Sequence, residues 1–308
     1  MPTIDYTNPS NTQPALFSPR VATLLLTLSF MLFFAAAILF FSRPPVSDKQ
    51  SYARAVLLGE IMMHSQRVAK AAQIALTGTD GGFKQLQESD QAIDAGLKIL
   101  AQGGQYQGQT IPQSTAESLA ALKEVQKIWG KSHRAAKTIL EAQEELMGVS
   151  RNLTKMQSMT SAVEEIGQQV STLYVQNGAS PREVSASSQL LMLLQRLAKN
   201  SHELLGAQGI EPETAFLLGR DADVFLQIIN GFIYGSQELR LSANKVPEIR
   251  SKLSELQTAF AEYHKLNKQN LGQLVKLIGA KQAESLIFSD SEQLKTSLEK
   301  LQKTYHPN

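Results

Sequence analysis

Cysteine does not occur in this chain of 308 residues. Its absence excludes disulfide bonds, thiol nucleophiles and thiolate metal sites. Aromatic residues make up only 6% of the sequence, and the net charge is only +2. A nucleic-acid-binding domain usually carries a strongly basic patch, and often aromatic side chains for stacking, so we expect no nucleic-acid partner.

Motifs of the common enzyme classes are also missing. The sequence contains no G-x-S-x-G nucleophile turn, no phosphate-binding loop and no H-E-x-x-H zinc motif. The histidines stand singly on different segments: His64, His133, His202, His264 and His306. We expect each to be a surface or hydrogen-bonded residue. The prediction is a protein that is not an enzyme and that holds no metal and no cofactor.

One long hydrophobic run stands near the N-terminus. Val21 to Phe41 reads VATLLLTLSFMLFFAAAILFF and contains no charge, glycine or proline. At about 1.5 Å per residue it spans a hydrocarbon core of about 30 Å, whereas a cleaved signal peptide usually has an apolar core of about 7–15 residues. We predict a transmembrane helix over 21–42. Arg20 and Arg43 flank the helix on its two sides, so the distribution of positive charge does not decide how the helix is oriented in the membrane. The simplest arrangement keeps the short tail over 1–20 in the cytoplasm and places the large remaining part of the chain outside.

The rest of the chain has helical periodicity. Turn signals such as TGTDGGF and NGASP separate long segments that contain no proline. Ser114 and Glu117 suggest a capping box before a segment whose apolar residues recur at helical spacing. QGGQYQGQTIP, residues 102–112, is expected to be a polar loop, and no alternation typical of strands is present. The fold class is therefore predicted to be all-α.

A short motif occurs twice, first as QRVAK and then as QRLAK. Segments with matching turns follow each copy, which indicates a duplication of about 130 residues. Each copy provides four helices, and none of them is amphipathic enough to be stable alone. We predict two tandem antiparallel four-helix bundles over 46–177 and 181–306. In this alignment Tyr263 takes the place of Trp129.

The candidate functional residues are the repeated pairs, Gln66, Arg67, Gln195 and Arg196. Each pair interrupts an otherwise apolar helix, and an arginine in such surroundings needs a partner. One candidate partner is a carboxylate on the following helix, where Asp90 and Asp223 stand at equivalent positions. A second is a bound anion, which the guanidinium fork suits, and a third is another protomer at a dimer seam.

The motif also carries a family resemblance. SQRVAK soon after a single anchor helix, followed by a second copy as LQRLAK, resembles the N-terminal domain of type IV pili methyl-accepting chemotaxis transducers, the PilJ-type sensor module. The resemblance covers about residues 15–306. Members of this family are bacterial inner-membrane receptors, which implies two modules in the periplasm. They are similar to the periplasmic sensor of nitrate kinases, which implies an anion-binding role for Arg67 and Arg196 across a dimer.

The resemblance implies a sensory region that controls type IV pilus (twitching) motility, with pilin or another pilus component as the stimulus. We expect a homodimer in the inner membrane that passes a helix displacement across the bilayer. A chemotaxis kinase or adaptor would be reached only through a cytoplasmic part beyond Asn308, with a second membrane helix and a methylated coiled coil. The alternatives are a periplasmic sensor of a small, nitrate-like anion and a membrane-anchored helical binding protein without signalling.

Overall fold

The computed structural model describes Met31, residues 49–204 and residues 212–305. Apart from Met31, the predicted tail over 1–20 and the predicted membrane helix over 21–42 lie outside the described residues. Among the residues that are described, no helix is both long and apolar enough to cross a membrane. From Lys49 onward the described chain is helical apart from one short hairpin and the connecting turns, which confirms the helical part of the predicted fold.

Four helices pack around a first apolar core, and we call this group the α2 bundle. They are α2 (Lys49–Leu76), α3 (Asp80–Gln102), α4 (Ala116–Glu141) and α9 (Leu274–Tyr305). α4 begins at Thr115, whose hydroxyl accepts a hydrogen bond from the Ser118 N–H at 3.4 Å, one residue after the predicted cap at Ser114. The fully buried core residues of α2 and α3 include Leu58, Ile61, Leu86 and Ile93.

A second core belongs to the α6 bundle. It is built from α5 (Gln143–Gln176), α6 (Pro181–Glu203), α7 (Pro212–Tyr234) and α8 (Pro247–Leu271). Ser180 starts α6 with a complete capping box, in which Glu183 binds back to the cap and a proline fills the first helical position. Stacked rings fill this core, since the Phe260 centroid lies 4.0 Å from that of Phe225 and 5.4 Å from that of Tyr263.

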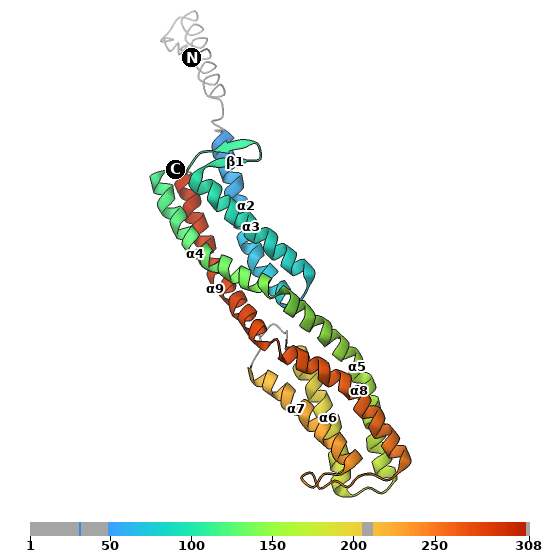
Figure 1. Ribbon diagram of the computed structural model, residues 1–308. Helices are drawn as coiled ribbons and strands as arrows, with labels where there is room; N and C mark the ends of the chain where they lie inside the picture. The colour runs from blue at the N-terminus through green and yellow to red at the C-terminus, as the bar shows by residue number, and fades with distance from the viewer. Residues whose placement is uncertain (1–30, 32–48, 205–211, 306–308) are drawn as a thin grey trace, which may run out of the picture. The chain divides into compact units, whose positions relative to one another are not determined.

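The fourth helix of each sequence repeat packs in the other bundle. α5 follows α4 in the chain but packs against α6 and α8, while α9 follows α8 but packs against α4 (Figure 1). Two short connections cause this exchange: Ala142 before α5 has φ −93° and ψ 11°, and Gly272 after α8 has φ −64° and ψ −19°. An antiparallel neighbour would need a loop that reverses the chain. These near-helical connections do not reverse it, so each fourth helix runs on into the other bundle.

The two bundles are equivalent halves that draw helices from both repeats. Burial recurs along the exchanged helices, with Val149, Met156, Val163 and Val170 of α5 matched by Ala280, Ile287, Leu294 and Leu301 of α9. Each of these helices also ends near a tyrosine, Tyr174 in α5 and Tyr305 in α9. The ranges 46–177 and 181–306 stay a prediction for the repeats, and each packed bundle contains helices from both ranges.

A two-stranded hairpin stands where the sequence predicted a polar loop over 102–112. β1 (Gly104–Tyr106) and β2 (Gln109–Ile111) pair antiparallel. The turn residues Gln107 and Gly108 both have positive φ, 48° and 75°, as a type I′ turn requires. Strands of 3 residues are too short to show an alternating pattern, which is why the sequence did not reveal them.

Candidate functional site

Arg67 lies on α2 and faces α3. Its Nη2 atom is 3.8 Å from Glu88 Oε2, and the two side chains are 40% and 49% exposed. The structure thus pairs Arg67 with Glu88 instead of the predicted Asp90. An exposed and loosely spaced ion pair contributes little to stability, about 0–1 kcal/mol. The neighbouring Gln66 is also exposed.

Arg196 on α6 makes a closer contact with α7. Its Nη2 atom donates to Asp221 Oδ1 at 2.5 Å, and again the acid stands two residues before the predicted one, Asp223. The Asp221 side chain is only 1% exposed, and Arg220 Nη2 lies 3.3 Å from the same oxygen. The other oxygen, Oδ2, is buried with no hydrogen-bond partner among the described residues. Such a buried carboxylate depends on its arginines for charge compensation.

The predicted acids bind histidines of the third helices instead. His133 Nδ1 lies 2.7 Å from Asp90 Oδ1, and His264 Nε2 lies 3.3 Å from Asp223 Oδ1. The reason is helix geometry, because two residues along an α-helix rotate a side chain by about 200°. An acid two positions earlier therefore faces the first helix of its repeat, and the predicted acid faces the third.

The two histidine–aspartate pairs differ in burial. The side chain of Asp90 is 8% exposed, whereas that of Asp223 is 63% exposed. Burial raises the pKa of the Asp90 carboxyl above its ordinary value, and the hydrogen bond with His133 opposes that rise. Each bundle therefore buries an aspartate, but Asp90 faces the third helix of its repeat and Asp221 faces the first.

Sequence reasoning missed the actual partners, Glu88, Asp221, His133 and His264. The histidines were recoverable, because they occupy the same position in the third helix of each repeat. The buried residues Leu122, Val125 and Trp129 of α4 correspond to Leu253, Leu256 and Phe260 of α8. This register places Phe260, and not the expected Tyr263, in the position of Trp129.

The end of α9 meets the start of α2. Tyr305 Oη is 2.6 Å from Ser114 Oγ, and the Arg54 guanidinium lies 4.9 Å from the centroid of the Tyr305 ring. Burial raises the pKa of the Tyr305 hydroxyl, which keeps it in its neutral, hydrogen-bonding form. The first and last helices of the α2 bundle are thus joined through side chains at one end.

The far end of the α6 bundle exposes apolar side chains. Val175 at the end of α5 is 60% exposed, and Tyr234 at the end of α7 is 72% exposed. The two helix ends are held together by neighbouring rings, since the centroids of Tyr174 and Phe232 are 4.6 Å apart. A groove of about 220 Å³ borders Tyr234 and is lined in part by Leu239. Exposed aromatic area beside a groove is typical of an interaction surface.

Comparison with known families adds to this geometry. Residues 57–168 match the family model for the N-terminal region of the type IV pili methyl-accepting chemotaxis transducer, PilJ. The matched stretch, residues 57–168, is therefore PilJ-like. The match begins inside α2 and ends inside α5, so it falls on the first repeat. It confirms the resemblance at the first Gln-Arg motif, Gln66 and Arg67, while the second motif lies outside the matched residues.

Two curated relatives are similar to this chain. Protein PilJ of Pseudomonas aeruginosa is 23% identical over 247 residues, which are 80% of this chain and 36% of the relative. The methyl-accepting chemotaxis relative AlkN of Alcanivorax borkumensis is 20% identical over 236 residues, which are 76% of this chain and 33% of the relative. The chain therefore spans about a third of the length of these relatives.

A solved structure also aligns with the chain. It is the TorS sensor domain in its complex with TorT in the presence of TMAO. The sequence identity is 12%, and the alignment covers 82% of this chain and 99% of that one. The TM-score is 0.39. At that score the two arrangements of helices differ too much to support an inference.

Proposed function

We propose that this chain is the membrane-anchored periplasmic sensory region of a methyl-accepting chemotaxis receptor that controls type IV pilus (twitching) motility. The PilJ-like match and the two relatives support the receptor class. The observation that carries the proposal is the meeting of two helices, where Tyr305 of α9 lies against Arg54 of α2. A receptor that reports a movement of one helix against another needs both helices side by side.

A movement in the α6 bundle would reach the contact between α9 and α2 through the exchanged helices α5 and α9. α5 and α8 run along the α6 bundle and connect through Ala142 and Gly272 to α4 and α9 of the α2 bundle. The two connected helix pairs are fastened together near these turns, because Asn152 Nδ2 donates to Asn270 Oδ1 at 2.9 Å. A load on the α6 bundle would therefore shift α9 against α2 by about 1–2 Å, a usual displacement at switching helix interfaces.

The stimulus in this proposal is pilin or another pilus component that contacts the far end of the α6 bundle. Exposed Val175 and Tyr234 provide the apolar area for that contact. The other partners are the inner membrane, through residues 21–42, and a second copy of the chain. Met63 and Gln66 lie exposed on α2, where a homodimer could form. A chemotaxis kinase or adaptor would act on a cytoplasmic part of the same receptor.

Binding of purified pilin to the whole receptor tests the proposed contact. Tyr234→Ala should weaken pilin binding by about tenfold, because truncating an interface tyrosine commonly costs about 1–2 kcal/mol. Val275→Ala is the matched control, since it removes another exposed apolar side chain, at the start of α9. Its pilin affinity should be unchanged. Equal weakening in both variants, or no effect in either, would reject the far end of the α6 bundle as the contact.

A small-anion sensor is the second candidate function, because Arg67 is partly exposed and only loosely paired. It predicts saturable nitrate binding in a calorimetric titration, with binding lost in Arg67→Ala. Pilin binding without nitrate binding supports the pilus receptor, and the reverse result replaces it with the anion sensor. Pilin binding that leaves the activity of the chemotaxis kinase unchanged would indicate a binding protein without signalling.

A further inference from the structure

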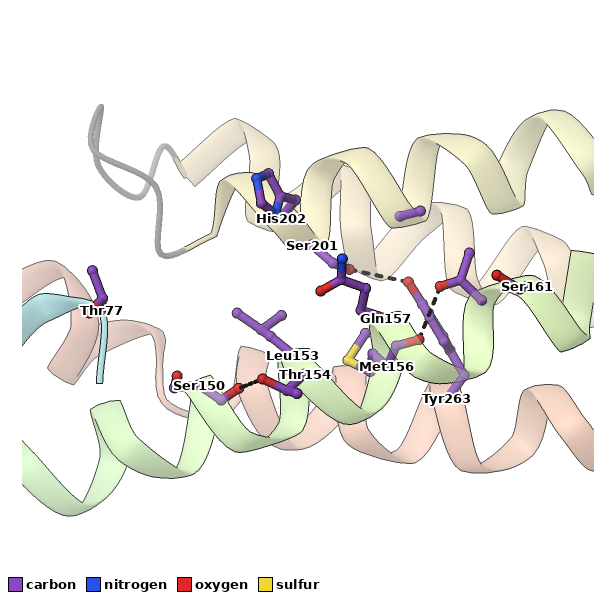
Figure 2. Close-up of a pocket in the computed structure, with 12 residues that line it drawn as sticks. Thr77, Ser150, Leu153, Thr154, Met156, Gln157, Ser161, Ser201, His202 and Tyr263 are labelled. Atoms are coloured by element: carbon purple, nitrogen blue, oxygen red, sulfur yellow. Dashed lines mark hydrogen bonds between the residues drawn. The ribbon is translucent and has the colours of Figure 1, made fainter. Parts of the chain in front are cut away.

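A pocket of about 520 Å³ lies where the α2 bundle meets the α6 bundle. One wall is α5 over residues 150–161, and the other is the last turns of α6, with Ser201 and His202. Figure 2 shows Tyr263 of α8 between these walls and Thr77, from the turn after α2, at one end. The volume is within the usual range for small-molecule sites, about 300–1,000 Å³.

The corresponding segment in the α2 bundle carries different chemistry. In the register of the exchanged helices, Ser150 and Leu153 of α5 correspond to Lys281 and Glu284 of α9. Lys281 Nζ lies 3.0 Å from Glu284 Oε2 in an ion pair. The pocket wall in the α6 bundle carries a hydroxyl and an aliphatic side chain at the same two positions. Its lining is therefore particular to this half and is not a general consequence of the repeated fold.

The hydroxyl groups of the pocket are prepared to accept hydrogen bonds. Thr154 Oγ1 donates to the Ser150 carbonyl oxygen at 3.0 Å, and Thr160 Oγ1 donates to the Met156 carbonyl oxygen at 3.0 Å. With their protons engaged, both oxygens keep lone pairs for a ligand that donates. No lysine, arginine, aspartate or glutamate is among the described residues that line the pocket. The titratable side chains of the described lining are His202 and Tyr263, so a charged ligand would lose hydration without meeting a permanent counter-charge.

The remaining lining adds an amide and an apolar surface. Gln157 can both donate and accept, and Leu153 and Met156 provide apolar contact beside it. Ser201 Oγ and Tyr263 Oη lie 3.2 Å apart in a buried hydrogen bond at the base of the pocket. We infer that this pocket binds a small uncharged compound of sugar size, with several hydroxyl or amide groups and one apolar face.

An occupant would contact both bundles. Thr77 belongs to the turn between α2 and α3, and its neighbour Gly78, at φ +73°, packs so closely on α5 that an added Cβ would lie 2.5 Å from the Leu146 carbonyl oxygen. A ligand that touches Thr77 and His202 together would fix this turn against α6. That the bound ligand acts as a second stimulus for the receptor rests on the proposed function. That the pocket binds the ligand does not.

Three sugars of one ring size but different charge test the inference. Saturation-transfer NMR on the whole chain in detergent would measure N-acetylglucosamine, which is neutral, beside glucosamine, which is a cation, and glucuronate, which is an anion. We expect saturable transfer to N-acetylglucosamine with a dissociation constant of about 0.1–10 mM, and at least about tenfold weaker binding of the charged sugars. Absence of transfer to N-acetylglucosamine at about 20 mM, or equal binding of all three sugars, would overturn the inference.

Two variants of exposed α5 hydroxyl residues localise the binding. Thr154→Trp fills the pocket and should reduce binding of N-acetylglucosamine at least about tenfold. Ser158→Trp, on the same helix but outside the lining, should leave it unchanged. Equal binding by both variants would place the sugar elsewhere and reject the pocket. Sugar binding without pilin binding would leave this inference standing while the proposed function fails, and pilin binding without sugar binding would do the opposite.

Discussion

The α2 and α6 bundles keep the same packing positions but differ in their polar groups. Arg67 meets Glu88 at 3.8 Å, where both side chains are exposed, whereas Arg196 meets the buried Asp221 at 2.5 Å. The motif around the two arginines is nearly identical. The depth of the acid on the following helix decides whether the ion pair is a weak surface contact or part of the core.

The second helices of the two repeats, α3 and α7, show how the polar residues of the two bundles differ. In the burial pattern of α3 and α7, Ser89 stands where Asp221 stands, and both are buried. Asp90 then matches Ala222, so the predicted equivalence of Asp90 and Asp223 is wrong by one residue. Ser89 Oγ is 3.1 Å from His64 Nδ1. The α2 bundle thus fills this position with a hydroxyl and the α6 bundle with a carboxylate. A duplicated scaffold can therefore preserve its core while the polar chemistry of one helix interface changes.

The largest expected effect is the loss of a core ring from the α6 bundle. Phe260→Ala should lower the free energy of unfolding by about 3–5 kcal/mol, because Phe260 is fully buried between Phe225 and Tyr263. Urea denaturation followed by far-UV circular dichroism would measure it. A loss below about 1 kcal/mol would show that this stack collapses without a cavity, contrary to close packing.

The second-largest expected effect is a difference in stability loss between the alanine variants of Arg196 and Arg67. Arg196→Ala should cost about 3 kcal/mol, because it leaves the buried Asp221 carboxylate with only Arg220 beside it. Arg67→Ala is the matched control and should cost less than about 1 kcal/mol. The same urea titration measures both variants. Equal losses would show that the burial of the acid does not distinguish the two pairs.

A smaller effect concerns pH and the α2 bundle. Because the pKa of folded Asp90 is raised above its ordinary value of 3.8, the folded state binds more protons than the unfolded state just above that pH. This group therefore contributes less stability as the pH rises from 3.8 through the raised pKa. Asp90→Asn should remove that contribution, so its unfolding free energy should depend less on pH from 3.8 through the raised pKa. Parallel pH profiles for the two proteins would contradict the expectation.

The smallest expected effect exchanges equivalent core residues. Trp129→Phe installs the residue that α8 carries at this position, and it removes an indole N–H that is buried without a partner among the described residues. The lost volume and the removed polar group oppose each other, so stability should change by less than about 1 kcal/mol. Phe260→Trp should cost more, about 1–3 kcal/mol, because it overfills a packed stack. Thermal unfolding of the two variants compares them, and the opposite order would refute the register that equates these positions.

Several features could be predicted from local sequence. The helices follow from apolar spacing and from turn signals such as TGTDGGF, and the repeat follows from QRVAK and QRLAK. The family resemblance rests on the same motif, and the PilJ match over 57–168 confirms it for the first copy. The ion-pair partners were not predictable in this way, because a shift of two residues moves a side chain to another face of the helix.

The sequence by itself indicated the helices, the repeated motif and the resemblance to a family, because each depends on residues that are close together in the chain. Only the tertiary structure decided the exchange of α5 and α9, because Ala142 and Gly272 are single residues whose backbone angles no composition signal reveals. It also decided which acid each arginine meets. The side chains of Arg67 and Arg196 are 40% and 39% exposed, but Glu88 is exposed and Asp221 is buried, because the depth of an acid depends on how neighbouring helices pack.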